Sequence, residues 1–323
     1  MRVKHLDLKE DLMSLIRKNG GFVNAHAHLD RAFTLNKENL IYVNRTLQEK
    51  WGLCNELKRR STVMDIYDRM AKGIELMISQ NVQAIGTFID VDKIVKDKSI
   101  KAAQKIRDKY GKDINIKYIN QIHYGVLNNK AREWFDIASE FVDIIGGLPE
   151  RDKGKEKEHI DILLGTAKSF GKMAHVHIDQ FNSPSQRDTE ILVRKVIEHK
   201  MEGRVAGIHV ISLAAQPAAY RKKIYNLMKK AEFMVISAPI AWIDSKRTEE
   251  LSPTHSSITP VDELVPYGIP VALGTDNIYD IYKPFASGNM WEDLHLMIEA
   301  CRYYNIEDMA NVATKNGLKV LGL

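Results

Sequence analysis

The sequence alternates short β-rich runs with segments of helical apolar spacing, and it does so eight times. Segments such as 63–79 and 189–201 carry the helical spacing. Strands that alternate with helices form parallel sheets through right-handed crossovers. Eight such units in one domain predict an α/β fold of the (β/α)₈ TIM barrel type, with an open doubly wound sheet as the structural alternative. The predicted strands cover 21–28, 82–91, 114–122, 141–148, 173–179, 205–211, 233–240 and 269–276.

The length of the chain suits one barrel. A (β/α)₈ barrel typically needs about 250 residues, and this chain has 323. Its hydrophobic content of 44% and charged content of 28% are those of an ordinary globular protein. We therefore expect a single barrel domain over residues 1–323.

Composition and charge exclude several classes of partner. The net charge of +5 is mild, and no basic face interleaved with aromatic residues suggests nucleic-acid binding. No apolar run reaches the roughly 18 residues of a membrane span, and the charged N-terminus lacks a signal core, so we expect a cytoplasmic protein. Cys54 and Cys301 are far apart and form no C-x-x-C pattern, which argues against a disulfide framework or a zinc ribbon.

Polar residues gather at or near the C-terminal ends of the predicted strands, where barrel enzymes place their chemistry. Two longer segments depart from the repeat. We interpret residues 29–61 as a lid or specificity insert over the barrel mouth, and residues 241–262 as a polar loop that also covers the site. The polar residues at the strand ends are His28, Asp90, Gln121, Asp179, His209 and Asp276.

His26 and His28 lie two residues apart on the first predicted strand, so both side chains point to one face. Two imidazoles that converge in this way are typical of a metal site. The alternative is a pair of unrelated histidines on a polar strand end.

His175, His177 and Asp179 share a face of the fifth predicted strand by the same period. Three such groups on a buried face are costly unless they are paired or bind a cation. The alternative is a hydrogen-bonded network without metal.

Asp276 closes the eighth strand, where it is either a hard oxygen ligand or a helix-capping aspartate. Taken with His26, His28 and His177, it completes a nitrogen and oxygen donor set suited to one divalent cation, Zn²⁺ or Fe²⁺. Such a cation lowers the pKa of bound water to near 7. His209 and Asp276 are the candidate bases.

These elements resemble the amidohydrolase superfamily, in the branch of cytosine deaminase and N-isopropylammelide isopropylaminohydrolase. The resemblance covers nearly the whole chain in order and spacing. Its matching stretches are GFVNAHAHLDRAF (21–33), TFIDVD (87–92), HVHID (175–179), GTDNIYDIYKPFASGNM (274–290) and ATKNGLKVLGL (313–323).

The resemblance implies a role for each matching residue. His26, His28, His177 and Asp276 look like the ligands of a single metal ion, with no carboxylated lysine on the fourth strand. His209 resembles a histidine that orients or deprotonates the metal-bound water, and Gln121 resembles a glutamine that hydrogen-bonds the substrate ring. The implied reaction adds water to a ring carbon and expels ammonia or an amine.

Two positions depart from the cytosine deaminase pattern. Gln180 stands where that enzyme has a proton-shuttling glutamate, and an amide does not ionise at neutral pH. Asp179 or His175 is then the candidate proton donor. Asn277 belongs to a DN-x-x-D pattern shared with the isopropylaminohydrolases, and we assign Gln180 and Asn277 to substrate binding.

Arg31 follows the first histidine pair and is either a ligand for an anionic group of the substrate or a structural ion-pair partner. The β-sandwich that usually flanks such barrels is not expected, since about 20 residues precede the first strand and the chain stops at LGL. Either the barrel stands alone or a second subunit of a homo-oligomer covers the open surface.

The sequence thus predicts a metal-dependent hydrolase that cleaves a C–N bond of a small nitrogen heterocycle. Another hydrolytic target, such as a lactam, is the alternative among enzymes. The alternative of a different class is a pseudoenzyme of the same fold that binds a metal or ligand without turnover.

Overall fold

The computed structural model describes residues 6–243 and 257–323. Eight strands form one parallel sheet in the order β1 to β8, so each strand pairs with its neighbours in the sequence. Every predicted strand is present, usually one to three residues shorter at its ends. The strands are β1 (Phe22–Ala27), β2 (Val82–Asp90), β3 (Asn115–Gln121), β4 (Ile144–Gly147), β5 (Met173–Ile178), β6 (Val205–His209), β7 (Met234–Ser237) and β8 (Val271–Leu273).

The sheet closes between its first and last strands. The backbone N–H groups of Thr275 and Asp276 donate to the carbonyl oxygen of His26 at 3.0 and 2.9 Å, and Ala27 forms a parallel bridge with Asp276. The expected barrel is therefore confirmed over the open sheet. The seam joins two segments that both carry predicted metal ligands.

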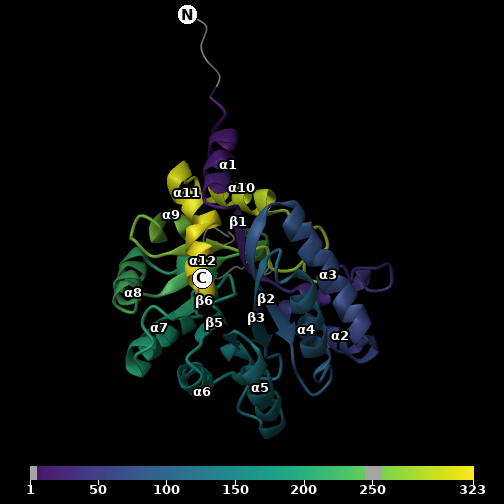
Figure 1. Cartoon of the computed structure of the whole chain (residues 1–323). Coiled ribbons are helices and arrows are strands. Elements are labelled where there is room, and N and C mark those ends of the chain that lie inside the picture. Colours follow the sequence, from purple (N-terminus) through teal and green to yellow (C-terminus); the bar gives the residue numbers. More distant parts are fainter. Residues whose placement is uncertain (1–5, 244–256) are drawn as a thin grey trace, which may run out of the picture.

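Helices surround the strands (Figure 1). Their starts follow local sequence signals: Thr62, for example, caps α3 by accepting from the backbone of Asp65, whose side chain accepts in return. The helices are α1 (Leu8–Lys18), α2 (Leu47–Arg60), α3 (Val63–Ser79), α4 (Lys98–Tyr110), α5 (Asn129–Phe141), α6 (Glu156–Ser169), α7 (Asp188–His199), α8 (Ala218–Lys230), α9 (Val261–Leu264), α10 (Met290–Cys301), α11 (Ile306–Ala313) and α12 (Lys315–Leu321).

The last helix closes one end of the barrel. In Figure 1, α12 lies across the middle of the ring of helices. Its Val320 and Leu321 pack in the same buried cluster as Val23 and Ala25 of β1. The barrel interior is thus filled with apolar side chains at this end, and the polar groups are left to the opposite end.

A bulge in β1 lets two pairs of side chains face the barrel interior. Val23 and Ala25 belong to the interior cluster with Phe88, and the rings of His26 and His28 contact Phe88 as well. A strict two-residue period cannot place all four inward. The pairing with β2 supplies the shift, because residues 24 to 27 of β1 lie opposite only residues 85 to 87 of β2.

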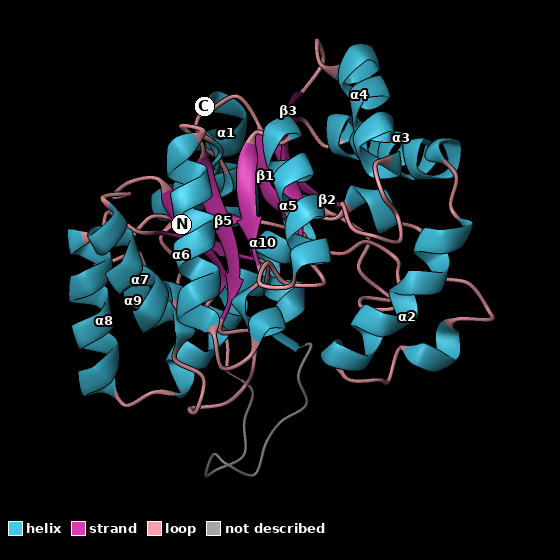
Figure 2. Ribbon diagram, turned by 90° about the horizontal axis from the view of Figure 1, so that it is seen from below, coloured by secondary structure: helices cyan, strands magenta, loops and turns pink. Residues whose placement is uncertain are grey.

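Residues 29–61 form an insert between β1 and α3. It contains two 3₁₀ turns, η1 (Leu29–Arg31) and η2 (Leu40–Tyr42), and the helix α2. Figure 2 shows α2 set apart from the strands and the other helices. The second predicted covering segment, 241–262, lies largely outside the described residues, which leave out 244–256.

The described residues contain no second sheet. Among these residues, no helix is both long and apolar enough to cross a bilayer.

Gly146 of β4 leaves room for a neighbouring backbone. A Cβ atom at this position would lie 1.9 Å from the Asn120 carbonyl oxygen and 2.9 Å from the Phe88 ring. Any larger residue would therefore push β3 or the aromatic ring on which the histidines rest.

We predict that Gly146→Ala lowers the free energy of unfolding by about 1–3 kcal/mol, because the added methyl overpacks a rigid contact. Gly165→Ala is the matched control, since a Cβ there meets no atom within 4 Å and alanine favours the interior of α6 by up to about 1 kcal/mol. Urea denaturation of both variants tests this, and equal stability of the two would contradict it.

Candidate metal centre

Four histidines and one aspartate meet at the open end of the barrel. The Nε2 atoms of His26 and His28 each lie 3.2 Å from Oδ1 of Asp276. The His26 and His177 ring centroids are 4.9 Å apart, and those of His177 and His209 are 5.6 Å apart. The structure thus brings together the four predicted ligands from β1, β5 and the segment after β8, with His209 of β6 beside them.

Several ring nitrogens of this cluster lack hydrogen-bond partners, as expected of nitrogens that bind a metal ion. All five side chains are buried. Neither ring nitrogen of His26 makes a hydrogen bond, although its Nε2 is close to the Asp276 carboxylate, and the Nδ1 atoms of His28 and His177 have no partner either. Burying such groups unpaired is costly. Two sets of three residues, which share His26, could each hold a metal ion: His26/His177/His209 and His26/His28/Asp276. Within each set, the ligand atoms lie within 4.8 Å of one another.

The electrostatics of the cluster favour the protonation states that bind metal. Burial lowers the pKa of His28 and His177 well below the usual value, and that of His209 to about 3. Burial alone would raise the pKa of Asp276, but His26 and His28 hold it well below the usual range. His28, His177 and His209 are therefore neutral imidazoles and Asp276 is an ionised carboxylate, which are the forms that coordinate a cation.

The backbone turns sharply where two of these residues leave their strands. His209 and Asp276 have φ angles of 76° and 58°. Non-glycine residues persist in this left-handed region only where their surroundings hold them. For His209 the surroundings include Thr259, whose hydroxyl donates to the His209 carbonyl oxygen at 2.5 Å.

The cavity beside the cluster is small, and the insert forms part of its wall. It measures about 20 Å³, enough for about one water molecule. Leu47 and Trp51 of α2 line it, which agrees with the prediction that residues 29–61 cover the barrel mouth. The predicted substrate-binding residues Gln121, Gln180, Arg31 and Asn277 line the same cavity.

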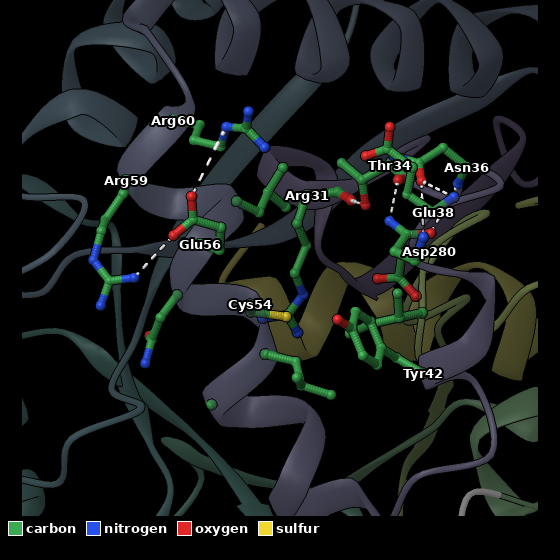
Figure 3. A pocket seen from close by; sticks show the side chains of 16 residues that line it. Arg31, Thr34, Asn36, Glu38, Tyr42, Cys54, Glu56, Arg59, Arg60 and Asp280 are labelled. Carbon is green, nitrogen blue, oxygen red and sulfur yellow. Dashed lines mark hydrogen bonds and ion pairs between the residues drawn. The ribbon is translucent and has the colours of Figure 1, made fainter.

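Two larger cavities adjoin this one. The first measures about 730 Å³ and shares Leu47 and Tyr282 with the small cavity. The second, about 460 Å³, lies between the insert and Asp280 and shares Arg31 (Figure 3). In Figure 3, the Arg31 side chain runs down to the level of Cys54 among the residues that line this second cavity. Its guanidinium also lies 3.8 Å from the Asp90 carboxylate. Arg31 therefore forms an ion pair and also lines the cavities.

Asp179, the predicted proton donor, lies against the start of α7 and is not among the residues that line the cavity beside the cluster. Its carboxylate accepts the backbone N–H groups of Asp188 and Thr189 at 2.8 and 3.2 Å. These belong to the first turn of α7, which has no intrahelical acceptors for them. The two-residue period failed here because β5 ends at Ile178 and Asp179 has a φ of 51°.

His175 binds a different part of the fold. Its Nε2 lies 2.8 Å from the carbonyl oxygen of Val320 in α12, so this nitrogen is the donor. His175 therefore joins β5 to the helix that closes the far end of the barrel, and it is not among the residues that line the cavity beside the cluster.

Sequence reasoning missed two residues near the cluster. Phe88 forms its floor, with its ring 4.6 Å from that of His177, and the apolar pattern of β2 was the only signal for it. Lys58 of α2 is buried against Asp90 and Asp92 at 3.1 and 2.7 Å, and no local pattern distinguishes it from the neighbouring Arg59 and Arg60.

Known proteins match this chain in sequence and in fold. The model of the amidohydrolase family matches residues 20–323. An uncharacterized protein of Haemophilus influenzae is 54% identical over 255 residues, covering 78% of this chain and 92% of its own. The N-isopropylammelide isopropyl amidohydrolase of Pseudomonas sp. (strain ADP) is 22% identical, covering 98% of this chain and 77% of its own.

Among solved structures, the 5-methylcytosine deaminase of Klebsiella pneumoniae superimposes with a TM-score of 0.86 at 24% identity. The match covers 94% of this chain and 74% of that one. It supports the barrel fold.

The buried His175 should make the free energy of unfolding depend on pH. Burial lowers its pKa to about 4, against 6.5 in the unfolded chain. As the pH falls below 6.5, the unfolded state takes up this proton first, so the native state loses about 1.4 kcal/mol of stability per pH unit down to about pH 4. His175→Gln keeps an N–H donor for Val320 and lacks this loss.

The measurement is urea denaturation of wild type and His175→Gln at pH 7 and pH 5. We expect the stability of the wild type relative to the variant to fall by about 2 kcal/mol between these values. His295→Gln, an exposed change on α10, serves as control. A difference that does not change with pH argues against a buried neutral His175.

Proposed function

The chain belongs to the amidohydrolase family and is a hydrolase of non-peptide C–N bonds, and we propose that it releases ammonia or an amine from a small nitrogen heterocycle. The proposal rests on one observation above all. The four predicted ligands come from three separate segments and meet in a buried cluster in which several ring nitrogens lack hydrogen-bond partners. The relatives named above, an isopropyl amidohydrolase and a deaminase, support the choice of a nitrogen heterocycle.

We assign His26, His28, His177 and Asp276 as the ligands of one divalent cation, zinc or iron. When bound, such a cation supplies a water molecule of lowered pKa at neutral pH.

Asp276 and His209 are the proposed proton-transfer groups. The low pKa of Asp276 keeps its carboxylate ionised at neutral pH, so it accepts the proton of the attacking water and returns it to the departing amine. His209 is neutral, because burial lowers its pKa to about 3, and it orients the water by a hydrogen bond. Gln180 does not ionise and is assigned to hydrogen bonding of the ring, together with Gln121, Asn277 and Arg31.

Substrate entry requires the insert to move. A cavity of about 20 Å³ does not hold a heterocyclic ring. Leu47 of α2 and Tyr282 line both this cavity and the neighbouring cavity of about 730 Å³. We propose that α2 shifts to join these spaces when substrate enters, and that it excludes bulk water once it has closed again.

We predict that the purified protein carries about one zinc or iron ion per chain. His177→Ala removes a ligand and is expected to lower the metal content several-fold, whereas the exposed His295→Ala leaves it unchanged. Elemental analysis by mass spectrometry, after dialysis, is the measurement. Wild-type protein that neither carries nor takes up zinc or iron would disprove the metal centre.

We further predict release of ammonia or an alkylamine from at least one member of a panel of amino- and alkylamino-substituted triazines, pyrimidines and pterins. Asp276→Asn is expected to lower kcat/KM by at least about 10²-fold, because it removes the base. His295→Ala is the control for handling and folding. The absence of release from the whole panel by metal-loaded wild type would count against the proposal.

A further inference from the structure

The cavity of about 730 Å³, which we call the outer cavity, is lined by cationic side chains and by no acidic residue of the described chain. Arg45, Lys50 and Lys283 lie in its wall. The remaining described wall is neutral, with Phe181 and Phe285 among its apolar side chains. A hollow with charges of one sign and low-dielectric walls concentrates ions of the opposite sign. The outer cavity is therefore suited to an anion.

The two lysines of this wall are buried, unlike Arg45. Lys50 and Lys283 each expose only 5% of their surface. Arg45 is exposed, and its guanidinium lies 3.5 Å from the Glu49 carboxylate. Within the described residues, the Lys50 ammonium has no hydrogen bond and no carboxylate partner, and it lies 5.9 Å from the centre of the Tyr282 ring. Because lysine is almost never fully buried unless it is paired, Lys50 requires a partner that these residues do not supply.

The two buried lysines also repel each other. Burial lowers the pKa of Lys50, and burial together with the charge of Lys50 lowers the pKa of Lys283 to about 7. Asp280 attracts Lys50 and Asp293 attracts Lys283, but both pKa values stay below the usual value of lysine. An anion in the outer cavity would stabilise both ammonium groups, since an opposite charge nearby favours the charged form.

The wall that carries the lysines continues into the small cavity beside the histidine–aspartate cluster. Leu47 and Tyr282 line both cavities, and Lys50 and Lys283 line the outer one. Lys50 follows Leu47 by three residues on α2, which places both side chains on one face of the helix. Lys283 follows Tyr282 directly in the chain. A substituent on a ring held at the cluster would therefore enter the space that the lysines line.

We propose that the heterocyclic substrate carries an anionic substituent, a carboxylate or a phosphate, and that Lys50 and Lys283 bind this group in the outer cavity. Lysine ammonium groups bind either anion as point charges. The apolar side chains of the wall then contact the carbon atoms that join the anion to the ring. The inference rests on the proposed function for the position of the ring.

The anion site is tested first with inorganic phosphate alone. Calorimetric titration of metal-loaded wild type should show saturable binding. Lys50→Met and Lys283→Met should each weaken it by at least about 10-fold, because each removes a hydrogen bond to a charged group. Methionine keeps an apolar stem in place, and the loss of a costly buried charge does not oppose folding. Equal phosphate affinity of wild type and both variants, or no binding to wild type, overturns the proposal.

Substrate selection is tested with two sets of matched rings. One set is pterin that carries a carboxylate, a hydroxymethyl group or the phosphate ester of that hydroxymethyl group on the same ring carbon, and the second set is cytosine with the same three substituents. In at least one set, an anionic member should bind at least about 10-fold more tightly than the neutral member. The carboxylate and the phosphate ester distinguish the two anions. Anionic members that bind no better than the neutral member in either set overturn the proposal.

The Lys50→Met variant connects this preference to the outer cavity. In the set that shows the preference, the variant should lower the ratio of anionic to neutral affinity by at least about 10-fold. Lys101→Met is the matched control, since this lysine is exposed on α4 and pairs with Asp97 at 2.8 Å. A ratio that is the same in Lys50→Met and Lys101→Met contradicts the assignment of the lysines.

Failure of this inference is distinguishable from failure of the proposed function. If anionic rings are preferred through Lys50 but no ring releases ammonia or an amine, the proposed reaction fails and the anion site stands. If neutral and anionic rings release ammonia or an amine and bind alike, the reaction stands and the inference fails. Phosphate binding at the lysines without any preference among the rings also overturns it, because the site would then take no part in substrate binding.

Discussion

The seam between β1 and β8 is the contact on which the candidate site depends. Three hydrogen bonds link the backbones of His26 and His28 to Thr275 and Asp276, so the chain positions that bear ligands are joined directly. Without this closure, Asp276 would lie at the far edge of an open sheet from β1. The closed barrel also brings the ends of β5 and β6 to the same mouth, which turns residues that are distant in the sequence into one cluster.

Packing inside the barrel supports this cluster from below. Phe88 touches the rings of His26, His28 and His177, and Gly146 leaves the space that its ring needs. Farther down, His175 binds the carbonyl oxygen of Val320, and the α12 side chains fill the opposite end. The imidazoles are thus held between an apolar floor and the mouth. Here burial keeps the pKa values of His28, His177 and His209 low and the rings free to coordinate a cation.

The insert between β1 and α3 supplies side chains to the cavity and to the charged network beside it. It contributes Leu47 and Trp51 to the cover of the cavity and Lys58 to the charged network behind Gln121. Because α2 carries all three residues, the helix that covers the site also holds the ammonium that is buried against Asp90 and Asp92. Movement of α2 would therefore alter access to the cavity and this buried charged network together.

The amino-acid sequence by itself determined the number and order of the strands, the barrel and the residues that meet in the histidine–aspartate cluster. These follow from local periodicity and from the rule that parallel strands end on one side. Only the tertiary structure decided the places of Asp179, His175 and Lys58. The first caps α7, the second binds α12, and the third is buried under the insert. Each of these depends on a partner distant along the chain or beyond the end of a strand, where the two-residue period no longer tells which way a side chain points.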